Sequence, residues 1–126
     1  MRMKIVWKIL SYLLAAFFIY AGVQHFIKPV FYEPFVPYFL PYKSLFVYAS
    51  GVLEVLFGVL VFVPRFARVG ATGILLLLIA FLPVHIMDVF AETPAIGTKT
   101  AAYIRLAVQF LFIAWALGVR KSITTK

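Results

Sequence analysis

The chain has 126 residues, of which 65% are hydrophobic and 13% are charged. A soluble domain carries about 25% charged residues, so this composition excludes an ordinary water-soluble fold and indicates a surface that faces lipid. The net charge of +8 would suggest nucleic acid in a soluble protein. Here the basic residues stand mostly at the ends of apolar runs, so we interpret them as markers of membrane topology and predict no nucleic-acid partner.

Four apolar segments follow one another along a single domain that covers residues 1–126. They run from about 5 to 25, 45 to 63, 69 to 85 and 101 to 119. Each is roughly 17–21 residues long, which is enough to cross the hydrocarbon core of a bilayer. Lipid cannot satisfy open backbone groups, so every segment should be helical. The sequence therefore predicts an all-α fold, an antiparallel bundle of four transmembrane helices.

The distribution of lysine and arginine predicts the orientation of this bundle. Basic residues gather before the first segment, between the second and third, and after the fourth. The two loops on the other side hold only Lys28, Lys43 and Lys99. The positive-inside rule then places both termini in the cytoplasm. We expect a multi-pass protein of the inner (plasma) membrane. The basic residues on the predicted cytoplasmic side are Arg2, Lys4, Lys8, Arg65, Arg68, Arg120, Lys121 and Lys126.

The outer loop between the first two segments, residues 26–44, is rich in proline and aromatic residues. Its prolines, at positions 29, 34, 37 and 41, exclude a regular helix. Two interpretations are open: the loop lies in the headgroup region, or it folds as a lid over the outer mouth of the bundle. The aromatic residues concerned are Phe31, Tyr32, Phe35, Tyr38, Phe39 and Tyr42.

Glu54 is the clearest candidate for a functional residue, because an ionisable side chain inside a membrane is costly and usually marks a functional site. It stands about 13 Å from the outer end of the second segment, near the bilayer midplane. Gly51 and Gly58 share a helical face with it. Since glycines let a neighbouring helix approach closely, we expect both glycines to lie against another helix and Glu54 to face the bundle.

The remaining polar residues gather toward the outer half of the predicted bundle. Each of the other three segments brings at least one there, and we expect Glu54 to lie within reach of Arg105 or Gln109, and of Tyr20 or Gln24. The sequence names no catalytic residue and predicts no metal site. The candidate ligand-binding residues are Glu54, His25, Gln24, Tyr20, Arg105, Gln109 and His85.

Structural interpretations of the same residues stand beside the functional one. Glu54 with Arg105 or Gln109 can be a buried pair that joins two helices, and His25 can bond a loop carbonyl. His85 with Asp88 can be a helix-end pair at the headgroups. An arginine beside Glu54 would favour a static ligand-binding or scaffold role, whereas tyrosine and amide neighbours would favour proton coupling.

Three stretches together resemble the DoxX family of small four-helix membrane proteins. They are AGVQHFIKP at 21–29, SGVLEVLFG at 50–58 followed by VPR at 63–65, and AFLPVHIM at 80–87. The resemblance implies a bacterial or archaeal membrane protein, and some members look like subunits of thiosulfate:quinone oxidoreductases. The chain has no cysteine for direct sulfur chemistry. The matching positions, to which the resemblance gives no catalytic role, are Gln24, His25, Pro29, Ser50, Glu54 and Arg65.

Three functions follow as hypotheses. The first is a subunit of a membrane redox or respiratory system that binds a quinone-like or small amphipathic ligand near the outer face. Such a subunit has no redox centre of its own and works with a membrane or peripheral redox partner. The second is a proton-coupled transporter of small molecules that uses Glu54 and forms a homodimer. The third is an assembly or scaffold subunit without a ligand.

Overall fold

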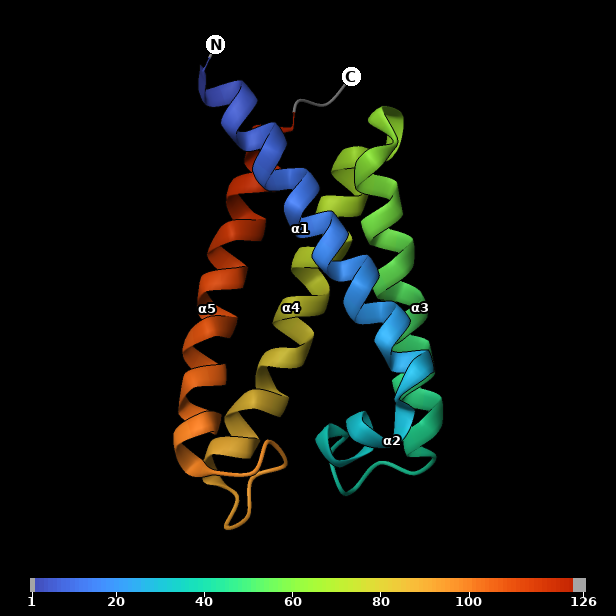
Figure 1. The fold of residues 1–126 in the computed structure, drawn as a ribbon, viewed down its shortest axis with the longest axis vertical. Helices are drawn as coiled ribbons and strands as arrows, with labels where there is room; N and C mark the ends of the chain where they lie inside the picture. The colour runs from blue at the N-terminus through green and yellow to red at the C-terminus, as the bar shows by residue number, and fades with distance from the viewer. Residues whose placement is uncertain (1, 124–126) are drawn as a thin grey trace.

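The computed structural model describes residues 2–123 of the chain, and this part is helical with no strand (Figure 1). Four helices are long: α1 (Arg2–Ile27), α3 (Lys43–Phe62), α4 (Ala67–Phe90) and α5 (Lys99–Ser122). Short elements join them, namely α2 (Pro29–Tyr32), η1 (Glu33–Phe35) and η2 (Pro64–Phe66). Each short element has a proline in its first turn, where the missing N–H costs nothing.

The four long helices are the predicted membrane spans. Each is long and apolar enough to cross a membrane, α4 together with η2, as expected for a multi-pass membrane protein. Many large apolar side chains point outward, for example Leu76 and Leu111, which are 59% and 69% exposed. An outward apolar surface of this kind suits a membrane. The all-α architecture, with four helices long and apolar enough to span a membrane, is therefore confirmed.

The helices run alternately up and down, so that the chain returns to the end where it began (Figure 1). We call the end where α1 begins and α5 finishes the terminal end. The opposite end, which carries α2, η1 and the 91–98 segment, is the loop end. Helix α1 packs mainly on α3, while α4 packs between α3 and α5. Helix α5 also touches α1, which closes the bundle.

Glycines bring α1 and α3 into close contact, as the sequence predicts for Gly51 and Gly58. A Cβ at Gly58 would lie 2.9 Å from the backbone oxygen of Ala15, and one at Gly51 would lie 2.9 Å from that of Gly22. Gly22, on α1, is equally tight, since its Cβ would meet the backbone oxygen of Gly51 at 2.6 Å. The two backbones therefore touch along this crossing, which sets the positions of side chains beside it.

Helix α4 differs from the prediction because it continues through Pro83 to Phe90 instead of ending near His85. A proline removes one backbone donor and so leaves the carbonyl of Ile79 without its usual partner, which membrane helices tolerate when neighbours help. The amide of Gln109 on α5 donates to the adjacent carbonyl of Leu78 at 2.6 Å. This bond ties α5 to α4 where proline weakens the helix, and Asp88 lies in the last turn of α4.

Candidate functional site

A buried pair of ionisable side chains lies where α1 meets α3. The Nε2 atom of His25 is 3.0 Å from Oε2 of Glu54, and the two side chains expose only 11% and 8% of their surface. The close glycine crossing explains the pairing, since Gly22 and Gly51 bring the backbones that carry both residues together. A buried carboxyl group within an apolar helix is costly unless it meets an opposite charge or shares a proton.

The other ring nitrogen of His25 is held by α3. Its Nδ1 atom lies 2.9 Å from the carbonyl oxygen of Val47 and 3.0 Å from Oγ of Ser50. A carbonyl can only accept, so a bond to Val47 requires a proton on Nδ1. The Ser50 hydroxyl, by contrast, can donate to Nδ1, or to the Val47 carbonyl 3.0 Å away. The cluster can thus place a proton on either nitrogen of His25, which suits proton exchange with Glu54.

Tyr32, at the end of α2, covers this pair from the loop end. Its ring centroid lies 4.2 Å from that of His25, with the planes tilted by 37°. Burial raises the pKa of the Tyr32 phenol, and the nearby charges of Glu54 and Tyr20 raise it further. The phenol therefore stays neutral and keeps a proton that it can donate.

One atom of the pair has unused capacity to bond. Oε2 of Glu54 is buried and accepts no hydrogen bond from any described residue, although His25 stands beside it at ion-pair distance. A buried acceptor without a hydrogen bond is costly in a structural site. The same atom can accept a further hydrogen bond from a suitable donor.

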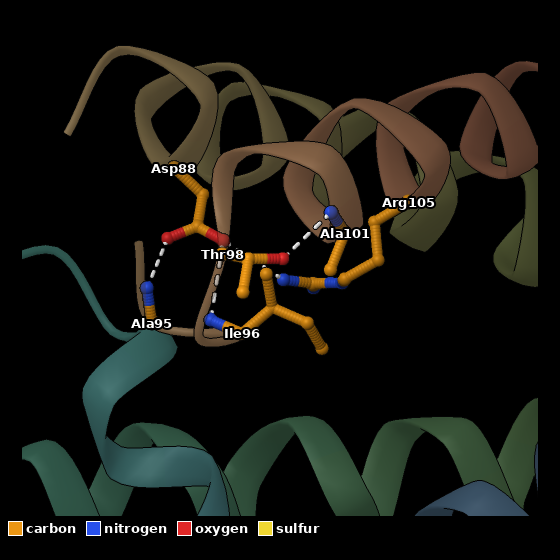
Figure 2. A network of polar contacts seen from close by, with 6 residues as sticks. All are labelled: Asp88, Ala95, Ile96, Thr98, Ala101 and Arg105. Carbon is orange, nitrogen blue, oxygen red and sulfur yellow. Dashed lines mark hydrogen bonds and ion pairs between the residues drawn. The ribbon is translucent and has the colours of Figure 1, made fainter. Parts of the chain in front are cut away.

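A second polar cluster joins α4, α5 and the segment between them (Figure 2). The Asp88 carboxylate accepts from the backbone N–H groups of Ala95 and Ile96, and Nη1 of Arg105 lies 3.5 Å from its Oδ2 atom. Thr98 caps the start of α5 by accepting from the N–H of Ala101 at 3.0 Å. Asp88 and Thr98 thus fix the path of the loop, and the Asp88 carboxylate also holds Arg105.

The aromatic loop lies against this second cluster as well. The guanidinium carbon of Arg105 stands 4.3 Å from the ring centroid of Phe35, a cation–π contact. Between the loop and α4 lies a cavity of about 250 Å³ lined by Phe35, Tyr38, Lys43 and Asp88 among others. Most aromatic residues of the loop are largely exposed: Phe31, Phe39 and Tyr42, and also Tyr38 at the edge of the cavity, expose 58% to 84% of their surface.

The structure corrects the predicted neighbours of Glu54. Arg105 pairs with Asp88 and Gln109 bonds the carbonyl of Leu78, so neither answers the carboxyl group. Tyr20 is 63% exposed, and no described hydrogen bond joins Tyr20 or Gln24 to Glu54. The partner is His25, a residue that the sequence placed in the same candidate site but did not name among the direct neighbours of Glu54.

His85 belongs to the second cluster, near Arg105, Asp88 and Gln109. Its Nδ1 atom is buried and has no partner among the described residues. Five of the seven candidates are thus divided between α1 and α3 (His25 and Glu54) and α4 and α5 (His85, Arg105 and Gln109). Among the described residues, no three His, Cys, Asp or Glu side chains gather as a metal site would require.

Sequence reasoning missed Tyr32 as the cover of the pair and gave Ser50 no contact with His25. Ser50 stands four residues before Glu54, so it lies on the same helical face, and this spacing was a usable signal. Nothing in the sequence distinguishes Tyr32 from the other aromatic residues of its loop.

We expect Asp88→Ala to free the 91–98 segment without unfolding the bundle. The substitution removes the acceptor of two backbone N–H groups, so the amides of Ala95 and Ile96 should exchange hydrogen faster, while those of α1 should not change. Glu92→Ala, which alters an exposed carboxylate of the same segment, is the matched control. Unchanged exchange in Asp88→Ala would show that the loop is held by other contacts.

Fold and site together define an all-helical protein with four candidate membrane spans and a buried histidine–glutamate pair near one end. The chain belongs to the family described as a domain of unknown function, DUF8561, which matches residues 14–120. Neither a curated protein nor a solved structure matches the chain.

Proposed function

We propose that this protein is a subunit of a membrane redox or respiratory system that binds a quinone-like or small amphipathic ligand at the His25–Glu54 pair. The single observation that carries the proposal is this buried pair, which has an acceptor atom without a hydrogen bond and an aromatic cover. A polar pair under an aromatic ring, within an apolar bundle, suits a flat ring that bears carbonyl groups.

The residues present fit such a head group. A bound quinone accepts electrons from a redox partner and takes up protons as it is reduced. The chain supplies the protons: His25 and Glu54 can hold one between them, and Ser50 can exchange one with the far nitrogen of His25. The neutral phenol of Tyr32 is a further donor. Apolar surface between the helices would hold the tail of the ligand.

Ligand retention tests this proposal. Protein purified in mild detergent should carry quinone in its organic extract, or bind added decylubiquinone, and Glu54→Gln and His25→Gln should lose it. Asp88→Asn is the matched control, because it neutralises a buried carboxylate of the other cluster. Equal binding by all four proteins, or by none, would contradict a quinone site at the pair.

A proton-coupled transporter is the second candidate, favoured by the same buried pair because it can gain and lose a proton. In vesicles with an internal pH dye, such a protein should move protons when a substrate gradient is applied, and Glu54→Gln should stop this. It should also form a homodimer, since four helices rarely enclose a path alone. A partner protein retained through detergent extraction, with neither ligand nor proton movement, would instead identify a scaffold subunit.

The orientation that we propose puts the terminal end in the cytoplasm of a plasma (inner) membrane and the loop end outside. Among the described ends of the bundle, the terminal end carries most of the lysine and arginine, as the positive-inside rule requires. Lys126, part of the same prediction, lies outside the described residues. The resemblance to the DoxX family is part of this proposal too, since it implies the same membrane and a redox setting.

Single cysteines test the orientation, because the chain has none of its own. In intact cells, an impermeant thiol reagent should label a cysteine at position 96, in the 91–98 segment, and should leave one at position 65 unlabelled until the cells are opened. Labelling of position 65 from outside would overturn the proposed topology.

We further propose that the segment from Pro29 to Phe35 is the lid of the site. Two contacts support this proposal: Tyr32 packs on His25, and Phe35 packs on Arg105. The outward aromatic residues of the loop suit the headgroup region. In a His85→Gln background, His25 is the only histidine. Tyr32→Ala should then speed modification of His25 by diethyl pyrocarbonate, whereas Tyr38→Ala should not. Equal rates would show that Tyr32 does not cover the site.

A further inference from the structure

The largest cavity described lies at the terminal end, far from the His25–Glu54 pair. It is a groove of about 1200 Å³ with walls from α1, α3, η2 and α4, and with Ser122 and Ile123 at the end of α5. Apolar side chains form most of these walls, including Trp7, Tyr12, Phe57 and Phe62. Four basic residues also line it: Lys4 and Lys8 from α1, Arg65 from η2 and Arg68 from α4.

No acidic side chain among residues 2–123 pairs with these cations. The chain has only four acidic residues, and none lines the groove. Glu33, Asp88 and Glu92 belong to the loop end, and Glu54 is paired with His25. Among described residues, Arg68 finds only a neutral acceptor, the carbonyl oxygen of Ile123 at 3.1 Å. Four cations that share a groove with no acidic side chain in its described lining attract an anion.

We infer that this groove binds one anionic phospholipid, with its phosphate among the four cations and an acyl chain along the apolar walls. The juxtaposition selects the ligand: the basic residues require negative charge, and the aromatic walls require a hydrocarbon tail next to it. An anionic lipid carries both on one molecule, and basic pockets between membrane helices commonly bind such headgroups. A free phosphate would leave the apolar walls unfilled.

Tryptophan fluorescence can test this directly, because the chain has two tryptophans and only Trp7 lines the groove. The ring of Trp7 packs on Gly118 of α5, so its position is fixed. Trp115 donates instead to the carbonyl of Leu10 and does not line the groove. Trp115→Phe therefore reports on the groove, and Trp7→Phe is the control.

The probes are brominated phosphatidylglycerol and brominated phosphatidylcholine, each added to nanodiscs of unbrominated phosphatidylcholine. We expect phosphatidylglycerol to quench Trp7 more strongly than phosphatidylcholine does, and both lipids to quench Trp115 alike. Each of Lys8→Gln and Arg65→Gln should reduce the preference about fivefold, the effect of one basic residue near an anionic surface. Lys121→Gln, which removes a cation of the same end outside the groove, should not.

Three results would overturn the inference. They are equal quenching of Trp7 by both lipids, an equal loss in Lys8→Gln and Lys121→Gln, and displacement of brominated phosphatidylglycerol by soluble glycerol phosphate, which would show a site for a free anion. Native mass spectrometry of the unaltered protein is a second measurement that does not depend on any variant folding. It should retain phosphatidylglycerol over phosphatidylcholine, and failure to do so contradicts a specific site.

Discussion

Replacing both members of the His25–Glu54 pair should cost the protein much less stability than the two single replacements added together. In Glu54→Gln the imidazole loses its acidic partner, and in His25→Gln the carboxyl group stays buried without a base. Removing one partner of a buried pair typically costs about 3–5 kcal/mol. The double variant leaves two neutral amides that can bond each other, so much of that cost should disappear.

Thermal or denaturant unfolding in detergent measures this coupling. We expect a coupling free energy of about 0.5–3 kcal/mol between positions 25 and 54, the range for residues in contact. The matched control combines Glu54→Gln with Arg105→Gln. These should be additive, because Arg105 pairs with Asp88. Coupling of Glu54 to Arg105 but not to His25 would contradict the described site.

Gly22→Leu should destabilise the bundle and should also disturb the site. A side chain at position 22 meets the backbone oxygen of Gly51 at 2.6 Å and the side chain of Val55 at 2.7 Å. Backbone cannot move away as a flexible side chain can, so α1 and α3 must separate. Overpacking of this kind typically costs about 1–3 kcal/mol, and the separation would also pull His25 away from Glu54.

The comparison that isolates this effect is Ala16→Leu, which adds the same kind of bulk to an exposed position of α1. We expect Gly22→Leu to lower the melting temperature in detergent and to weaken quinone binding, and Ala16→Leu to change neither. A Gly22→Leu protein as stable as the unaltered one would show that the two helices do not touch through backbone at this point. If Gly22→Leu lost quinone binding but kept its melting temperature, the effect on the site would not come from destabilisation of the helix crossing.

Most of the architecture could be predicted from composition and hydropathy, because the bilayer leaves few alternatives. Long apolar runs must be helices there, so four spans follow from the sequence, and the spacing of Gly51 and Gly58 places them at a helix contact. Helix ends were less certain. The third segment was predicted to end at about residue 85, whereas α4 continues to Phe90, and Gln109 from another helix bonds the carbonyl of Leu78 near Pro83.

The sequence by itself determined which residues are chemically unusual, among them Glu54, His25 and Arg105, because a polar side chain stands out within an apolar segment. Only the tertiary structure decided which of these side chains pair with each other. The position of a residue along its helix can be counted from the sequence. The neighbour that its side chain meets depends on which helices pack together and how they cross. The contact of Gly22 with Gly51 turns His25 toward Glu54, and the extended α4 gives Asp88 to Arg105.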